Sequence, residues 1–313
     1  MKVFLVRRLF SSIITVIGAT IIVFGLSRAA GDPLLLYAKP GGYGVSPEQK
    51  AALERKLGLN KPLAFQYFVW FGQMIRGDLG RTLLDEKPVS RILAERVSAT
   101  FQLGLYAWIL ATAVGVPLGV LSAVKRGTLW DYIGRSIALL GAALPSFWVA
   151  IVLILVFSVR LGWFPAATRG DAGWFGWSYV ILPMVTLAWG SLAGYLRLTR
   201  GAMLEILDSE FIKLARSKGV TRQRVIWKHA FRNALIPPLT ASVLILVGFF
   251  NGVVLIEFVF AWPGLGRAAV AAVNENDFPV IQAVVLFFTL AFVVMNFITD
   301  MLYAFIDPRI RYD

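Results

Sequence analysis

The sequence predicts an all-α integral membrane protein with about six membrane-spanning helices, and both its composition and the spacing of its charges lead to that prediction. Of the 313 residues, 58% are hydrophobic and 16% are charged, and the mean hydropathy is +0.71. A soluble domain is nearer to about 45–50% apolar and about 25% charged. Much of the apolar surplus must therefore face lipid. The chain has no cysteine, which excludes disulfides and thiolate metal sites.

Stretches without Asp, Glu, Lys or Arg locate the expected spans, because a helix needs about 20 mostly apolar residues to cross the hydrocarbon core. The stretches of sufficient length are 9–27, 97–124, 136–159, 172–196, 233–256 and 278–299. The lack of ionisable groups in them argues against a proton-driven carrier. Stretch 9–27 has an alternative interpretation as a cleaved signal peptide, but it is longer than the about 7–15 apolar residues of such a segment.

The distribution of charge predicts the orientation of the spans. The chain carries a net charge of +13. A nucleic-acid-binding protein would place these cations on a polar face, whereas here they lie between apolar stretches and fit the positive-inside rule. Segment 197–232 holds nine Lys and Arg residues against three acidic ones, and segment 257–277 holds three acidic residues against Arg267. Both termini are therefore expected in the cytoplasm.

The chain is expected to form one domain, 1–313, with an extracytoplasmic segment at 28–96 and a helical core at 97–305. Within the outer segment, Ser46 followed by Pro47 is typical of a helix start. Segment 63–75 is rich in aromatic residues but too short to span. It is expected to lie along the outer membrane interface or on the bundle.

The motifs of common enzymes are absent from the sequence. There is no Gly-Lys pair and therefore no Walker-type phosphate loop. His229 is the only histidine, which excludes multi-histidine metal sites. There is no G-x-S-x-G nucleophile motif either. The sequence therefore predicts neither an enzyme nor a metal or cofactor site.

Segment 208–238, called the elbow below, is the most informative part of the sequence. A first short helix is expected to end at Gly219, and Thr221 can cap a second one. The narrow apolar stripe of the first helix is expected to comprise Phe211, Leu214, Ala215 and Lys218, and the apolar face of the second to comprise Val225, Ile226, His229 and Ala230. Two interpretations remain: a basic loop held against anionic lipid, or a pair of helices that docks in a partner's groove.

The elbow resembles the EAA loop of ABC importer permeases, in the version found in the dipeptide/oligopeptide/nickel branch. The resemblance rests on the run FIKLARSKG at 211–219 and the run HAFRNALIP at 229–237. In the general EAA pattern Glu stands where this chain has Lys213, and two Ala residues stand at Leu214 and Ala215. The glycine of the pattern is Gly219, and a later proline is Pro237.

Further segments that resemble this family follow in order along nearly the whole chain. They are GDP at 31–33, GDLG at 77–80, GVPLG at 115–119, LPSFW at 144–148, LGWFP at 161–165, FAWPGLGR at 260–267, DFP at 277–279 and DPR at 307–309. One such motif is weak evidence, whereas this many in order is specific. The chain is most similar to the first of the two related permeases of such an importer.

The resemblance implies a multi-pass protein of the inner membrane that carries dipeptides or oligopeptides. It implies a sister permease, two ATPase subunits, a substrate-binding protein outside and surrounding lipid as partners, with no nucleic acid. ATP and Mg²⁺ would be bound by the ATPases, and this chain would need no cofactor. The same branch includes permeases for nickel and oligosaccharides, and a self-sufficient channel or secondary carrier is the alternative of another class.

The resemblance also assigns roles to particular residues. The coupling residues expected to contact the ATPase, within segment 208–225, are Phe211, Lys213, Leu214, Ala215, Arg216, Lys218, Gly219 and Val220. Independently of the resemblance, polar residues within the spans are candidates to line the pathway, with interhelical contact as the alternative role for each: Ser146, Thr186, Ser191 and Asn251. An outer gate or loop is expected at Trp262, Pro263, Gly264 and Asp277.

Overall fold

The computed structural model describes residues 2–29, 60–82, 85–170 and 173–306. Helices account for most of these residues, and no strand occurs among them. The expected helix start at Ser46 lies outside the described residues. The elements are α1 (Lys2–Ala29), α3 (Leu63–Ile75), α4 (Val89–Val124), α5 (Leu129–Ala143), α6 (Ser146–Leu153), η1 (Ile154–Arg160), η2 (Gly173–Phe175), α7 (Trp177–Leu207), α8 (Glu210–Ser217), α9 (Arg222–Arg224), η3 (Val225–Phe231), α10 (Arg232–Ala234), α11 (Ile236–Val259), α12 (Leu265–Asn274) and α13 (Phe278–Ile306).

The described residues contain 4 helices that are long and apolar enough to cross a membrane, in α1, α4, α7 and α13. If α5 and the following α6 and η1 count together as one broken span, the number of candidate spans rises to 5. In α11, the described apolar part is the shorter helix Ile236–Leu246. The prediction of an all-α chain with several apolar spans is therefore confirmed.

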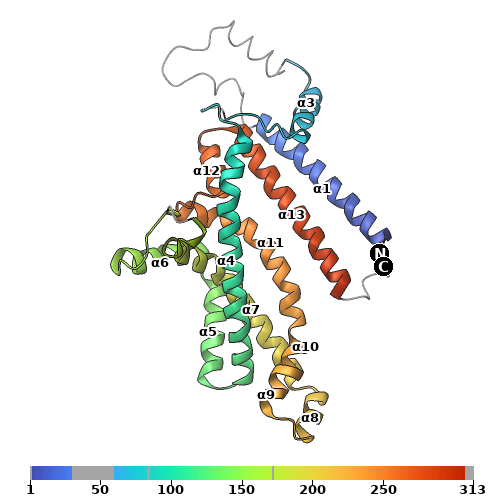
Figure 1. Ribbon diagram of the computed structural model, residues 1–313, viewed down its shortest axis with the longest axis vertical. Coiled ribbons are helices and arrows are strands. Elements are labelled where there is room, and N and C mark those ends of the chain that lie inside the picture. The colour runs from blue at the N-terminus through green and yellow to red at the C-terminus, as the bar shows by residue number, and fades with distance from the viewer. Residues whose placement is uncertain (1, 30–59, 83–84, 171–172, 307–313) are drawn as a thin grey trace. The chain divides into compact units, whose positions relative to one another are not determined.

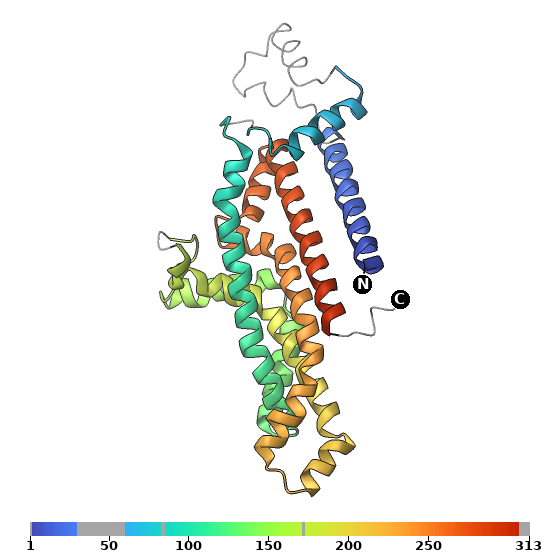
Figure 2. The same cartoon turned by 45° about the vertical axis from the view of Figure 1, so that its right-hand side comes forward.

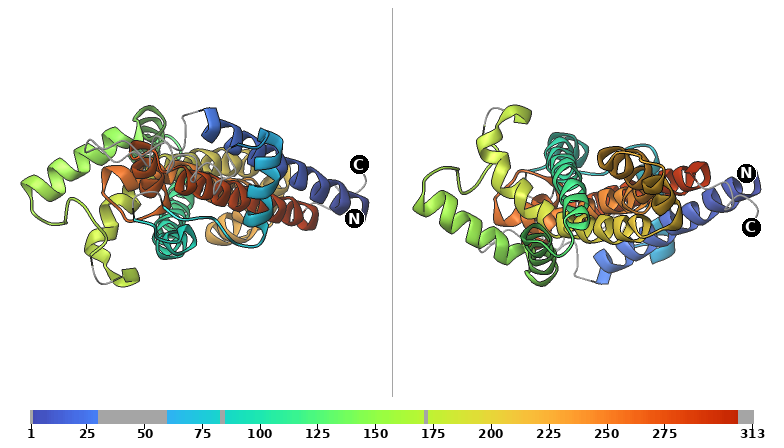
Figure 3. Two further views of the ribbon diagram at one scale, coloured as in Figure 1. Left: turned by 90° about the horizontal axis from the view of Figure 1, so that it is seen from above. Right: turned by 90° about the horizontal axis from the view of Figure 1, so that it is seen from below.

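The expected third span differs from a single straight helix. Stretch 136–159 is broken after α5, and the two parts meet at a bend of 109°. Pro145 stands at this break and precedes the first residue of α6. Proline lacks a backbone N–H and its ring clashes with the preceding turn, so it favours a break at this position. Pro117 and Pro183, by contrast, lie inside the continuous helices α4 and α7. Figure 3 shows α6 and η1 leaving the direction of α5.

The chain folds as two compact units. Unit 1 comprises Met1–Ala99 and Gly264–Asp313, and unit 2 comprises Thr100–Pro263. In unit 1, α1 packs on α13, where Arg8 Nε lies 3.1 Å from the Asp300 carboxylate. The aromatic helix α3 lies on α1, since the Tyr67 and Thr20 hydroxyls are 2.9 Å apart. The predicted contact of segment 63–75 with the bundle is thus observed within this unit (Figure 1).

The core of unit 1 is an apolar cluster between the first turns of α4 and α13 and both ends of α12. Its buried members are Val89, Leu93, Leu265, Ala272, Val280, Ala283 and Val284. Asp277 stands directly before α13 and is 3% exposed, and its Oδ1 accepts a hydrogen bond from Val280 N at 3.5 Å. A carboxylate at a helix N-terminus satisfies backbone donors that have no partner within the helix.

Unit 2 is organised around α7, which packs against α5, α6, α10, α11 and η3. Buried apolar residues recur along α7 at helical spacing on the faces that these neighbours cover, among them Val180, Leu187, Leu196 and Met203. Each neighbouring helix therefore takes its position from this 31-residue helix.

Two glycines allow α4 to approach α7 closely. A Cβ atom on Gly115 would lie 2.7 Å from the Leu192 carbonyl oxygen, and one on Gly119 would lie 2.7 Å from Thr199 Cβ. Glycines four residues apart on one helix face let two backbones pack tightly in membranes, where dispersion and small residues drive association. The GVPLG segment at 115–119 is therefore a packing motif in this structure.

Replacing Gly119 with alanine is expected to weaken the contact between α4 and α7. The added methyl group has no room, and overpacking of a tight contact costs about 1–3 kcal/mol. Gly194 in α7 is the matched control, because nothing lies within 4 Å of its missing Cβ. In detergent, G119A is expected to lower the midpoint of thermal unfolding while G194A leaves it unchanged or raises it. Equal midpoints for the two variants would contradict the close approach.

Candidate functional site

The elbow begins where α7 ends and turns back at Gly219. The backbone of Gly219 has φ +75, a left-handed conformation that favours glycine. Its N–H donates to the Arg216 carbonyl at 3.0 Å, and the N–H of Val220 donates to the Ala215 carbonyl at 3.2 Å. This pair of bonds is a Schellman motif, which closes the C-terminal end of α8. The first short helix therefore ends at Gly219, as expected. Figure 2 shows the yellow and orange ribbon of the elbow turning back at this end of the unit.

One face of α8 is buried in unit 2. Ile212 is 0% exposed and belongs to an apolar cluster with residues of α4, α7, η3 and α10. The buried members of this elbow cluster are Val120, Ala123, Met203, Ile212, Val225, Ala230 and Ala234. Ile212 is not among the residues of the predicted stripe, although its spacing of three from Ala215 is a helical signal.

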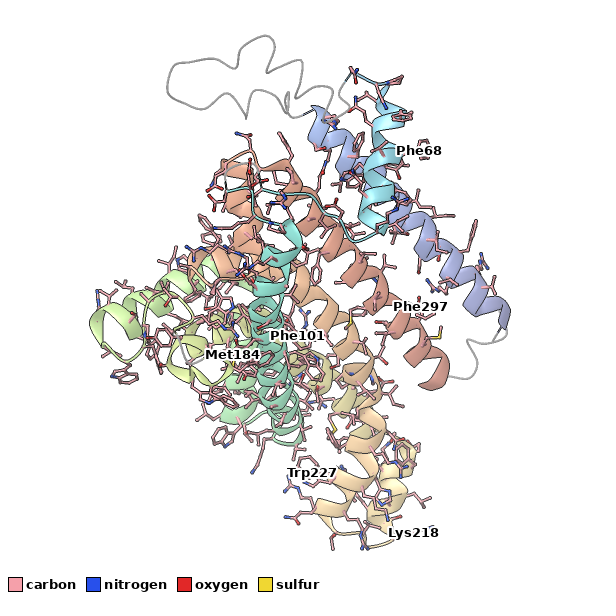
Figure 4. The ribbon with its side chains drawn as sticks, turned by 45° about the horizontal axis from the view of Figure 1, so that its top comes forward. Phe68, Phe101, Met184, Lys218, Trp227 and Phe297 are labelled. Carbon is pink, nitrogen blue, oxygen red and sulfur yellow. The ribbon has the colours of Figure 1, made fainter. Side chains whose placement is uncertain are left out.

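The opposite face of α8 carries exposed apolar and basic side chains. Phe211 is 44% exposed and Leu214 is 56% exposed. The expected stripe of Phe211, Leu214 and Lys218 therefore does not face the core of this chain, because Ile212 takes that place. Lys213 and Arg216 are also exposed, and Ala215 and Val220 are half-buried. In Figure 4, Lys218 and Trp227 lie at the tip of the elbow.

The second part of the elbow is α9 followed by η3, a seven-residue π-helical turn. Val225 and Ala230 are buried and Ile226 and His229 are half-buried, as the expected apolar face requires. Thr221 stands at the N-cap position, but its side chain makes no capping hydrogen bond. The first backbone hydrogen bond of this helix is donated by Val225 N to the Thr221 carbonyl, at 3.0 Å.

A buried ion pair fixes the α4–α5 turn against α7, next to the elbow. Arg200 of α7 donates to Asp131 of α5 through Nε at 2.7 Å and through Nη2 at 3.1 Å. The same carboxylate accepts from the Ser122 hydroxyl at 2.7 Å and from Gly127 N at 3.1 Å. A carboxylate with two guanidinium contacts and two further donors has its hydrogen-bonding capacity filled. No local pattern in the sequence singles out Asp131.

The candidate pathway residues lie in different environments. Ser146 is exposed at the start of α6. Thr186 is 1% exposed and donates to the Leu182 carbonyl of its own helix at 2.8 Å. Ser191 is half-buried in α7. Asn251 falls within α11, but its side chain lies outside the described residues. The role of these residues in lining a pathway stays a prediction.

The expected outer-loop residues follow α11. Trp262 is 0% exposed and Pro263 is half-buried at the end of unit 2. Gly264 begins unit 1 as the residue before α12, and Asp277 stands before α13. Trp262 is therefore a fully buried residue, and the role of this loop as an outer gate stays a prediction. Among the described side chains, no group of three or more His, Asp or Glu residues could hold a metal ion.

Two family models together match nearly the whole chain. Residues 115–312 match the model described as binding-protein-dependent transport system inner membrane component. Residues 1–104 match the model of the N-terminal part of the membrane component of such systems. The boundary between the models falls within α4.

Individual relatives cover the chain from end to end. The oligopeptide transport system permease protein AppB of Bacillus subtilis is 38% identical over 100% of both chains. The dipeptide transport system permease protein DppB of Escherichia coli is 38% identical over 99% of this chain and 98% of the relative. The fold is similar to that of the inward-facing methionine ABC transporter MetNI, with a TM-score of 0.57, 19% identity and coverage of 69% of this chain and 96% of the other.

Replacing Asp131 with asparagine is expected to destabilise the protein by about 3–5 kcal/mol, because Arg200 would be left buried without its counter-charge. The matched control is Asp208→Asn, which removes an exposed pair with Arg126 at 3.5 Å; exposed pairs contribute about 0–1 kcal/mol. Thermal unfolding in detergent should show a large drop for D131N and almost none for D208N. Similar midpoints for both would show that the ion pair does not hold the turn.

Proposed function

The chain belongs to the family of inner membrane components of binding-protein-dependent transport systems, and we propose that it is the first of two permease subunits of an ATP-driven importer of dipeptides or oligopeptides. The substrate class is supported by the relatives, whose names specify dipeptide and oligopeptide transport. The permease itself is not an enzyme. It forms the pathway together with a sister permease, and its partners supply ATP hydrolysis and solute capture.

The observation that carries the proposal is the two-sided environment of α8. Ile212 anchors one face in unit 2, while Phe211 and Leu214 leave apolar surface on the other. Apolar side chains rimmed by cations on a short protruding helix suit a partner's groove better than bulk water. We assign that groove to the ATPase subunit, which Phe211, Lys213, Leu214, Ala215, Arg216, Lys218, Gly219 and Val220 would contact directly or shape.

Lys213 differs in charge from the residue of the general EAA pattern, and this changes the contact that α8 is expected to make with the ATPase. Lys213 occupies the position of the glutamate in the general EAA pattern, and its Nζ lies 2.7 Å from Glu210 one turn earlier. An exposed pair of this kind contributes little to folding. Both side chains can therefore re-pair with a partner, so the charge at this position is available to the ATPase surface.

Movement of the elbow can reach the membrane through α7. The elbow cluster joins α8 to α4 and α7, and the Asp131–Arg200 pair joins α5 to α7. A 31-residue helix is about 46 Å long at 1.5 Å per residue, enough to cross the bilayer. We infer that closure of two ATPases on ATP and Mg²⁺ moves the elbow and rocks α7, giving alternating access.

The full topology is part of the same proposal. We assign six spans, with α11 as the fifth and α5 with α6 and η1 as a broken third. The 24 residues of α11 carry no charge before Glu257 and would be about 36 Å long. Both termini and the elbow then lie in the cytoplasm, since the basic segments share that side. Residues 28–96 and the loop around Trp262, Pro263 and Gly264 lie outside, with Asp277 capping the next span.

Co-purification and reconstitution test the function. The tagged chain is extracted from its native membrane in mild detergent, its partners are identified by mass spectrometry, and the assembly is placed in liposomes. Recovery of a sister permease and Walker-type ATPases, with ATP-dependent uptake of a tripeptide, is the expected result. Solute movement by this chain alone would instead support a channel or carrier. Uptake of nickel or an oligosaccharide but no peptide would reassign the substrate.

Two separate variants of α8, Leu214→Ala and Ile212→Ala, should distinguish a residue that binds the ATPase from a residue that stabilises the fold. Leu214→Ala removes exposed apolar surface, so we expect normal thermal stability but weaker retention of the ATPases during purification. Ile212→Ala empties a buried site and is expected to cost about 2–5 kcal/mol of stability. Thermal unfolding and ATPase recovery are measured on both variants. Full ATPase retention by L214A would remove this face of α8 from the interface.

Replacing Gly219 with valine should uncouple transport. A β-branched residue in the left-handed region costs about 1–2 kcal/mol or more, and no atom lies within 4 Å of the position, so the effect comes from the backbone alone. Asparagine tolerates this conformation and provides the control, Gly219→Asn. We expect G219V to lower peptide uptake per ATP hydrolysed and G219N to retain most of it. Normal coupling in G219V would contradict the role of this turn.

A further inference from the structure

The loop between η1 and α7 holds a charged side chain that the elbow mechanism does not use. Arg169 Nε donates to Oε1 of Gln102 at 2.8 Å. The guanidinium carbon lies 5.8 Å from the ring centroid of Trp262. Gln102 and Trp262 are each 0% exposed, whereas Arg169 is half-buried. A cation at the edge of unit 2 is thus held by two side chains that belong to its core.

Gln102 is itself held in one orientation. Its Nε2 donates to the carbonyl oxygens of Gly173 at 3.3 Å and Trp174 at 3.2 Å. The Tyr106 hydroxyl also donates to the Trp174 carbonyl, at 3.0 Å. With its amide nitrogen occupied in this way, Gln102 presents its oxygen to Arg169. The guanidinium therefore has a fixed support rather than a mobile surface neighbour.

The backbone around Arg169 is strained in a way that sets its position. Thr168 has φ 77, which is an outlier for a β-branched residue, and Gly170 has φ 66. Thr168 N donates to the Phe260 carbonyl at 2.8 Å, which ties this loop to the end of α11. The ring of Tyr179 fills the space that a side chain on Gly170 would need. Strain of this kind persists where the surrounding structure enforces it, and it is concentrated at binding sites.

Arg169 keeps unused hydrogen-bonding capacity. Of its five N–H groups, the Nε–H alone has a protein acceptor in the part of the chain that the structure describes. Burial lowers the pKa of the Arg169 guanidinium below its ordinary value. The guanidinium is half-buried, and no described carboxylate forms an ion pair with it. The planar fork of terminal nitrogens matches a carboxylate, which would accept two parallel hydrogen bonds.

Arg169 and the elbow lie at opposite ends of α7. The loop of Arg169 precedes Trp177, and the elbow follows Leu207, about 46 Å further along the helix. In the topology proposed above, Arg169 therefore faces the side from which the binding protein delivers solute. A peptide arriving there carries one free carboxylate at its C-terminus.

We propose that Arg169, supported by Gln102 and Trp262, binds the C-terminal carboxylate of the peptide as it passes from the binding protein into the permease. This inference rests on the proposed peptide transport. Arg169 is the binding residue, and Gln102 is a positioning residue that holds the fork. The site selects for solutes with a free terminal carboxylate over those without one.

The test compares tri-alanine with tri-alanine amide in liposomes that contain the complete transporter and its binding protein. Uptake kcat/KM is measured for the wild type, R169Q, R169K and the control R160Q, which removes an exposed arginine from the end of η1. The same binding protein is used with every variant, so its own preference for a terminal carboxylate cancels when the variants are compared. ATP hydrolysis stimulated by the binding protein is recorded in parallel, as a check on folding and docking.

We expect R169Q to reduce kcat/KM for tri-alanine about tenfold to a hundredfold, with little effect on the amide and on stimulated ATP hydrolysis. R169K should fall between, because it keeps the charge without the fork, and R160Q should match the wild type. Equal loss for both peptides, together with lost stimulation, would place the partner carboxylate on the binding protein and overturn the inference. Unchanged uptake in R169Q would overturn it as well. Absence of tri-alanine uptake by the wild type would overturn the proposed peptide function itself.

Discussion

The burial of Ile212 among residues of α4, α7 and η3 is the constraint on which the elbow depends. Without that anchor, α8 would be eight residues long with no packing partner, and isolated helices of this length are not stable in water. Its anchoring leaves Phe211 and Leu214 on the outer face. The same contact that makes the helix stable therefore also determines which side chains remain for a partner.

The contacts around α7 explain how movement at one end of unit 2 can be transmitted to the other end. Gly115 and Gly119 bring α4 against it, Asp131 bonds Arg200 from α5, and the elbow cluster closes its last turns. Each of these contacts is short or buried, so displacement of one end requires the others to move or break. Tightly packed interiors transmit such strain rather than absorb it. At the other end, the loop of Arg169 is held by Gln102, Trp262 and a strained backbone.

Three positions depart from local sequence rules, and each lies at a bend of the chain or at a proposed contact. Pro145 breaks the third apolar stretch and directs α6 away from α5. Lys213 stands where the general family pattern has an acid. Thr168 has a positive φ beside Arg169. Local rules are broken at these positions because a tertiary or functional requirement outweighs them, which is where such violations are expected in real proteins.

The sequence by itself determined the all-α membrane class, the apolar stretches, the end of α8 at Gly219 and the buried Val225 and Ala230. These follow from the composition, the spacing of apolar residues and the backbone freedom of glycine, all of which are properties of the local sequence. Only the tertiary structure decided that Ile212 rather than Phe211 and Leu214 faces the core, because both helix faces carry apolar residues and their partners lie far away in the chain. The same holds for Asp131 with Arg200 and for Arg169 with Gln102. Sixty-nine and sixty-seven residues separate these pairs, and no local pattern relates side chains that meet only through folding.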